Sequence, residues 1–153
     1  MNVTLDLLGS QHQDVLARLD EMERALGGGE SVALAPFASY LVQEVAHHFE
    51  IEEQALFPLL GRHLSSEQGP LAVMNAEHAS FRELLQRLRD GLDSGRAEQA
   101  QECARDIIDL LRAHIVKEDH VLFPMAARLL SPEELQEVDA RAMAFGPAAH
   151  SAR

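Results

Sequence analysis

Two stretches of the chain combine a histidine with carboxylates at helical spacing. Residues 48–58 read His-Phe-Glu-Ile-Glu-Glu-Gln-Ala-Leu-Phe-Pro, and residues 114–124 read His-Ile-Val-Lys-Glu-Asp-His-Val-Leu-Phe-Pro. On an α-helix, residues four positions apart lie one turn apart on the same face. Each stretch therefore presents an imidazole beside a carboxylate, His48 with Glu52 and His114 with Glu118. Both groups are ligands of transition-metal ions, so the pattern indicates a metal site.

The two stretches belong to a longer internal repeat with a constant offset. The repeat pairs His12 with His78 (78 − 12 = 66), His48 with His114 (114 − 48 = 66) and Glu52 with Glu118 (118 − 52 = 66). We interpret each half as one helical hairpin. Two such hairpins predict an all-α fold, an antiparallel up-down-up-down four-helix bundle with approximate two-fold symmetry.

The helices that must position these residues are visible as apolar residues spaced three and four apart. We expect helices at about residues 4–26, 32–57, 70–92 and 96–123, followed by a short fifth helix at about 132–145. Residues 1–153 are expected to form a single domain, in which the bundle covers about residues 4–130. No strand pattern is apparent.

Turn residues set the expected ends of these helices. Glycines at residues 27–29 and at residues 91 and 95 predict the two hairpin turns. Pro58 and Pro124 lack the backbone donor that a helix needs, so we expect Pro58 to kink or stop the second helix and Pro124 to end the fourth. Ser131, Pro132 and Glu134 have the pattern of a capped helix start.

Height along the bundle provides a further test of the repeat. If the first turn is centred at Gly29, His12 lies 29 − 12 = 17 residues before it and His48 lies 48 − 29 = 19 residues after it. At 1.5 Å per residue, these positions in an antiparallel hairpin are level within about 3 Å. The second hairpin gives the same counts around Gly95. The six repeated side chains should therefore meet in one slice of the core. The four remaining histidines do not recur and are expected at the surface: His47, His63, His120 and His150.

Composition limits the classes of function. Lys and Arg number 13 and Asp and Glu number 25, which gives a formal net charge of −12. Such an acidic surface disfavours binding to nucleic acid or to an anionic membrane surface. The sequence contains no apolar run of the roughly 20 residues that a membrane span needs, and no signal-peptide pattern. With its single cysteine, Cys103, the chain is expected to be cytoplasmic, and a monomer or weak homodimer.

Four imidazoles and two carboxylates at one level exceed what one ion requires. Two metal ions, each with two histidines and bridged by both carboxylates, would use every ligand. These donors suit iron, manganese, zinc or copper, and the lack of thiolates disfavours an iron–sulfur or structural zinc site. A bridged redox pair would suit two-electron chemistry on O2, peroxide or nitric oxide. The alternative is that each His–Glu pair is only a surface helix pair, but two copies in register with two further histidines disfavour it.

At these residues the sequence resembles the hemerythrin-like, or HHE cation-binding, proteins over roughly residues 5–130. The likeness is carried by the helix of His12, by Glu77-His78, and by the two stretches that begin at His48 and His114. It implies a four-helix bundle that holds a non-heme di-iron centre with an oxo or hydroxo bridge. The implied terminal ligands are His12, His48, His78 and His114, and the implied bridges are Glu52 and Glu118.

The sequence departs from the oxygen-carrying members of that family at two points. Those proteins have a second histidine four residues from the first on the third helix, where Met74 and Arg82 flank His78 here. They also usually place the second bridge five residues after its histidine, at the position of Asp119, which adjoins Glu118. The resemblance is therefore to the bacterial four-histidine branch, associated with peroxide breakdown, nitric oxide handling, iron-centre repair or sensing.

These observations leave the exact activity open between classes. A redox-active di-iron protein that reacts with O2, peroxide or nitric oxide is favoured, and it could be an enzyme of peroxidase, catalase-like or NO-reducing type. The alternatives are a non-catalytic sensor or binder of O2, nitric oxide or iron, and a metal-storage protein, with manganese or zinc in place of iron. Three further residues could join the site: Arg82 at a bound anion, Glu44 beside a ligand imidazole, and Tyr40 as an additional ligand.

Overall fold

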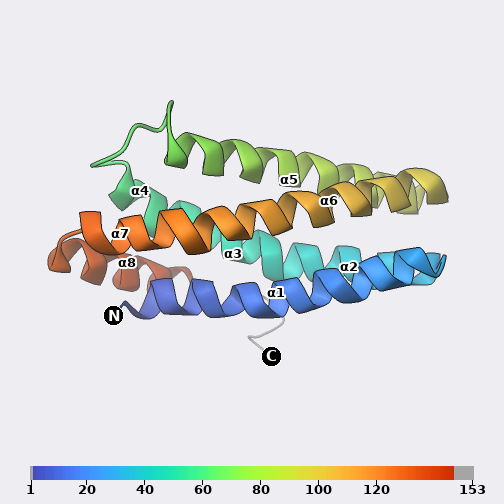
Figure 1. Cartoon of the computed structure of the whole chain (residues 1–153), viewed down its shortest axis with the longest axis horizontal. Helices are drawn as coiled ribbons and strands as arrows, with labels where there is room; N and C mark the ends of the chain where they lie inside the picture. The colour runs from blue at the N-terminus through green and yellow to red at the C-terminus, as the bar shows by residue number, and fades with distance from the viewer. Residues whose placement is uncertain (1, 147–153) are drawn as a thin grey trace.

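The computed structural model describes residues 2–146, which form four long helical rods packed side by side and one shorter helix (Figure 1). The first rod is α1 (Val3–Gly27) and the third is α5 (Pro70–Asp93). The second rod consists of α2 (Leu34–Tyr40), η2 (Leu41–Val45), α3 (Ala46–Ile51), η3 (Glu52–Leu56) and α4 (Phe57–Leu60), after a short 3-10 turn, η1 (Ser31–Ala33). The fourth consists of α6 (Ala97–Lys117), η4 (Glu118–Leu122) and α7 (Phe123–Leu129), and the shorter helix is α8 (Pro132–Phe145). No strand occurs within residues 2–146, so the predicted all-α helical bundle is confirmed.

The two hairpin turns have the same backbone conformation, as the repeat predicts. Gly29 and Gly95 have φ angles of 73° and 69°, in the left-handed region that glycine adopts without a steric penalty. In each turn the glycine N–H donates to a carbonyl three residues before it, and the next N–H reaches back five residues, Glu30 to Ala25 and Arg96 to Gly91. This is the glycine-terminated helix end that closes the last carbonyls of a helix.

The expectation that Pro124 ends the fourth helix is wrong, and of the kink or stop expected at Pro58 the stop does not occur. The second rod continues through Pro58 to Leu60, and the fourth continues through Pro124 to Leu129. A π-helical segment precedes each proline, and the N–H groups of Phe57 and Phe123 donate to carbonyls five residues earlier. The extra residue in a π turn moves the preceding carbonyls away from the proline ring, so each helix passes its proline.

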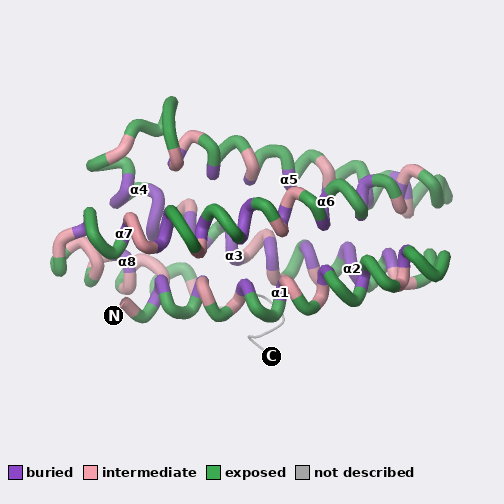
Figure 2. The backbone as a smooth tube through the Cα atoms, in the orientation of Figure 1, coloured by how far each residue is buried: buried purple, intermediate pink, exposed green. Residues whose placement is uncertain are grey.

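Buried residues lie mainly on the faces of the rods that are turned toward one another (Figure 2). The apolar ones form two clusters. One cluster contains Phe37, Leu88 and Ile107, toward the hairpin turns. The other contains Leu8, Leu60 and residues of α8, toward the opposite end. The buried polar side chains of the bundle, apart from Thr4, lie where each rod passes from one cluster to the other. The fold therefore places a polar slice between two hydrophobic cores.

Helix α8 has no counterpart in the repeat and packs across the first hairpin. Its start at Ser131 has the predicted capping box, with the Ser131 and Glu134 side chains each bonded to the other's backbone N–H (3.1 and 3.0 Å). Asp139 accepts hydrogen bonds from the backbone and hydroxyl of Thr4 (3.0 and 2.6 Å), and Asn2 donates to the Leu135 carbonyl (3.0 Å). Within residues 2–146, no helix is both long and apolar enough to cross a lipid bilayer.

The hairpin turns give a test of the fold. A Cβ at Gly95 meets no atom within 4 Å, so the Gly95→Ala variant carries only the backbone cost of a left-handed alanine. We expect its free energy of unfolding to fall by about 1–2 kcal/mol in chemical denaturation. Gly27→Ala, in the last turn of α1 with equally open space, is the matched control. It should be neutral or stabilising by up to about 1 kcal/mol. Equal losses in the two variants would contradict the assigned turn.

Candidate metal centre

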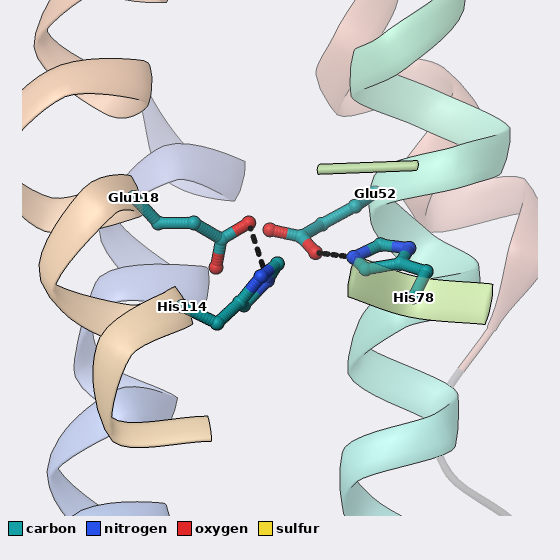
Figure 3. Close-up of side chains that lie close together, drawn as sticks. All are labelled: Glu52, His78, His114 and Glu118. Carbon is teal, nitrogen blue, oxygen red and sulfur yellow. Dashed lines mark hydrogen bonds and ion pairs between the residues drawn. The ribbon is translucent and has the colours of Figure 1, made fainter. Parts of the chain in front are cut away.

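The structure brings together the six repeated polar side chains, one or two from each rod. Residue exposures are 0% for Glu52, His78 and Glu118, 1% for His114, 2% for His12 and 4% for His48. Figure 3 shows the carboxylates of Glu52 and Glu118 pointing toward each other, with the rings of His78 and His114 beside them. Two overlapping groups have ligand atoms mutually within 4.8 Å: Glu52, His78, His114 and Glu118, and also His12, His48 and Glu118.

Glu118 makes contact with histidines from both halves of the repeat. Its Oε1 lies 2.9 Å from His12 Nε2 and 3.6 Å from His48 Nε2, while its Oε2 lies 3.4 Å from His114 Nε2. The Glu118 carboxylate thus contacts His12 and His48 through one oxygen and His114 through the other.

Glu52 is placed in the same way. Its Oε1 lies 3.1 Å from His78 Nε2 and its Oε2 lies 3.5 Å from His48 Nε2. The rings form two pairs, His12 with His48 (centroids 4.9 Å apart) and His78 with His114 (5.2 Å). Both carboxylates therefore lie between the two pairs of imidazoles, which is the arrangement that two bridged ions would need.

Each of the four rings is held at its outer nitrogen by another side chain. The Nδ1–H groups of His12, His48, His78 and His114 donate to Asp119 (2.7 Å), Gln11 (2.8 Å), Glu53 (2.8 Å) and Glu77 (2.8 Å). These acceptors fix the tautomer with the proton on Nδ1, so the Nε2 lone pair of every ring faces the centre. The rings are thus oriented as metal ligands commonly are.

Four buried atoms at the centre have no hydrogen-bond partner within the described chain. They are Nε2 of His48, Nε2 of His114, Oε2 of Glu52 and Oε2 of Glu118. A buried polar atom left unpaired costs about 1–3 kcal/mol, so four in one place require an explanation. All four can donate an electron pair, and they belong to residues of the two ligand groups, so bound cations would satisfy them. The donor set therefore fits a metal ion.

The carboxylates are electrostatically coupled. Burial, reinforced by the neighbouring charge of Glu118, raises the pKa of Glu52 well above its usual value. Burial would also raise the pKa of Glu118, but its close contacts with Glu52 and with the imidazoles of His114, His12 and His48 outweigh burial and hold that pKa well below its usual value. Without metal, Glu52 is therefore the carboxyl group of the pair that keeps its proton to higher pH.

The two rings of the second hairpin shift in opposite directions. Burial lowers the pKa of His78 to about 4, which keeps its ring neutral at physiological pH. Burial acts in the same direction on His114, but the proximity and charge of the Glu118 carboxylate, 3.4 Å from its Nε2, prevail and raise its pKa. Because a metal ion needs neutral imidazoles and ionised carboxylates, its binding would release the protons held here.

Aromatic rings wall off the centre. Phe49 stacks on His78 with ring centroids 3.8 Å apart and planes at 10°. Phe123 stacks on His12 at 5.5 Å and 9°, and Phe57, its counterpart in the repeat, lies 5.3 Å from His78. These rings restrict rotation of the imidazoles and keep water from the carboxylates.

Three further residues were suggested from the sequence as members of the site, and none of them belongs to either ligand group: Arg82, Glu44 and Tyr40. Arg82 forms a two-fold ion pair with Glu53 (2.7 and 2.8 Å), so it supports the His78 tether. Asp119 tethers His12, whereas the hydrogen bond to His48 comes from Gln11 and Glu44 lines a surface groove beside it. Tyr40 lies under Arg18, 5.4 Å from its guanidinium, outside both groups of ligand atoms.

The histidines outside the repeat also lie outside the centre. His63 and His120 are exposed, and His150 lies beyond the described residues. His47 is only partly exposed, because its Nε2 bonds to the Gly146 carbonyl (3.0 Å) at the end of α8. Three of the residues that accept hydrogen bonds from the ring Nδ1–H groups were not predicted in this role: Gln11, Glu53 and Glu77. The repeat contains the signal, since Gln11 pairs with Glu77 and Glu53 with Asp119, each next to a predicted ligand.

The raised pKa of Glu52 predicts how the stability of the metal-free protein changes with pH. A raised pKa in the fold means that the contribution of Glu52 is complete at low pH and is lost as pH rises through the folded pKa. We expect the free energy of unfolding to fall as pH rises above the ordinary carboxyl pKa of 4.5, by up to about 1.4 kcal/mol per unit while Glu52 keeps its proton. Glu52→Gln, which mimics the protonated acid, should remove most of this slope. The exposed control Glu50→Gln should keep it, and equal slopes in both variants would refute the assignment.

Comparison with known proteins agrees with this geometry. The model of the Hemerythrin HHE cation binding domain matches residues 3–126. Iron-sulfur cluster repair protein YtfE of Enterobacter sp. (strain 638) is 31% identical over 128 residues, an alignment that covers 76% of this chain and 58% of that protein. The proteins of the same name from Citrobacter koseri and Escherichia coli O157:H7 are 30% and 29% identical with the same coverage.

The chain thus spans 58% of the length of these relatives. No solved structure matches it. The family model covers most of the bundle and all six side chains of the centre, in the helical fold that the structure shows. The chain therefore belongs to the hemerythrin HHE cation-binding domain family.

Proposed function

We propose that this chain binds two iron ions at the centre and uses them to react with O2, peroxide or nitric oxide. The observation that carries the proposal is the position of Glu52 and Glu118, each with one oxygen toward either pair of histidines. The four unpaired donor atoms support it, because two ions could satisfy all of them. Residues 1–153 would form one domain around this site, since α8 packs on the first hairpin.

Two metal positions follow from the contacts. The first position would be held by His12 and His48, and the second by His78 and His114. Glu52 and Glu118 would bridge the two. Each ion would then have two imidazoles and two carboxylate oxygens, which leaves places for a small ligand on an octahedral metal.

Iron fits this donor set better than the alternatives. Two histidines with carboxylates and open places are typical of non-heme iron sites that handle oxygen. Cys103 lies in the apolar cluster toward the hairpin turns, and the ligand groups contain no thiolate. Manganese and zinc also accept these donors, so analysis of bound metal is the first test of the proposal.

Bound iron would supply reversible one-electron oxidation and a place for the reactant. The protein contributes the other conditions. Four Nδ1 tethers aim the ring lone pairs, and Phe49 and Phe123 exclude water from them. The ligand side chains are at most 4% exposed, which favours reactants as small as a diatomic gas or peroxide. Asp119 connects the His12 ring with a surface cavity of about 580 Å³ that it lines, which would let protons pass between ring and solvent.

The names of the relatives favour a second candidate. Three relatives at 29–31% identity are named iron-sulfur cluster repair proteins, so iron itself could be the cargo of this centre. A sensor or storage role would use the same ligands without turnover. Reversible spectral change with O2 or nitric oxide and no consumption of reactant would indicate a sensor. Release of iron to an apo-cluster protein would indicate repair.

Metal analysis separates the ligands from other histidines. Wild-type protein loaded anaerobically with ferrous iron should retain about two irons per chain after desalting. We expect His12→Ala to retain distinctly less, because the substitution removes a ring with an aimed Nε2. His120→Ala is the matched control, since His120 is exposed and outside both ligand groups. Equal iron content in the two variants would contradict the proposed ligand set.

Peroxide turnover tests the redox part of the proposal. The iron-loaded protein should release O2 from hydrogen peroxide faster than the same concentration of free iron. Glu118→Ala should abolish this excess, because Glu118 contacts three of the four rings. An O2 electrode measures the rate, and exposed Glu133→Ala is the control. Activity no greater than that of free iron, with full iron content, would leave sensing, storage or repair.

A further inference from the structure

The two proposed metal positions are alike in their ligands but differ in one outer hydrogen bond. The repeat maps His48 onto His114, and the residues that hold their Nδ1–H groups are Gln11 and Glu77 (77 − 11 = 66). Both hydrogen bonds are 2.8 Å long. The geometry is therefore matched while the acceptor changes from a neutral amide to a carboxylate.

The surroundings of the two acceptors also differ. Glu77 also forms an ion pair with Lys117, so its carboxylate is fixed at the rim of the bundle. Gln11 lines a surface groove of about 680 Å³ between α1, α3 and α8, together with Glu44 and His47. The repeat places Ile51, which is apolar, at the position equivalent to Lys117 (117 − 66 = 51). The first hairpin thus offers no counterpart of the Glu77–Lys117 pair.

The remaining two tethers are both carboxylates. Asp119 holds His12 in the first position, and Glu53, which is paired with Arg82, holds His78 in the second. The second position therefore has two carboxylate acceptors behind its rings, and the first has one carboxylate and one amide. A carboxylate acceptor increases the electron donation of a ligating imidazole, and such outer partners change metal affinity by about 10–100-fold.

We infer that Gln11 makes the two iron positions electronically unequal, with the position of His12 and His48 as the weaker donor set. Gln11 and Glu77 are positioning residues, because each acts on the metal through an imidazole. This inference rests on the proposed di-iron function. It adds that the bridged pair is asymmetric by construction, with the ferric state favoured at the position of His78 and His114.

The Mössbauer spectrum of protein loaded with 57Fe measures this inequality directly. Wild-type protein should show two quadrupole doublets of equal area, one for each iron. The single variants Gln11→Glu and Glu77→Gln each make the two acceptors alike, so we expect the doublets to converge toward one in both. The double variant with both substitutions exchanges the acceptors and should restore two doublets. A role that was only structural would not predict recovery in the double variant.

Matched controls introduce the same charge changes away from the rings. Gln13→Glu on α1 and Glu83→Gln on α5 are at exposed positions and should leave both doublets unchanged. A single doublet in wild-type protein, or two unaltered doublets in Gln11→Glu and Glu77→Gln, would overturn the inference. If one single variant does not fold, the other decides the question.

Iron content from the same samples distinguishes a failure of the proposed di-iron function from a failure of the proposed inequality between the two iron positions. Fewer than two irons per chain in wild-type protein would refute the di-iron function itself. Two irons per chain with doublets that do not respond to either substitution would refute only the asymmetry.

Discussion

The structure depends on the burial of four imidazoles and two carboxylates in one slice between two apolar clusters. Buried polar groups are destabilising unless they are paired, and buried charges even more so. The protein itself provides a hydrogen-bond acceptor for the outer nitrogen of each imidazole, one for each Nδ1–H. It leaves four inner atoms without partners. A centre that is satisfied outside and unsatisfied inside is suited to a ligand with positive charge.

Duplication of a hairpin explains how so many polar groups could be buried together. Each hairpin supplies two rings and one acid, and neither could bury them without the other. Of the π-helical segments within residues 2–146, η3 and η4 recur with the same offset, beginning at Glu52 and at Glu118 (118 − 52 = 66), so these widened turns carry the two carboxylates. Segment η2 has no such counterpart, because the equivalent residues belong to α6. The two halves differ where α8 packs on the first hairpin and where Gln11 occupies the position equivalent to Glu77. Those differences give the halves unequal surroundings.

Prediction from the sequence was correct for features that depend on a single helix and its ends. The turns at Gly29 and Gly95 and the capping box at Ser131 agree with the structure, because each depends on neighbours within a few residues. The helix end expected at Pro124 was wrong, and the stop expected at Pro58 as an alternative to a kink does not occur, because proline rules assume a regular α-helix. The π turns that let both helices continue depend on how the rods pack around the centre.

The helical faces and the heights of the six polar residues follow from the order of the amino acids, because helical periodicity and a constant offset are properties of a single chain. Tertiary structure alone decided which oxygen meets which ring and which side chain holds each Nδ1–H. Asp119 reaches His12 across 107 positions of sequence, and Glu77 reaches His114 across 37. Such partners lie on different rods. Their pairing depends on the rotation and separation of packed helices, which no periodicity along one helix specifies.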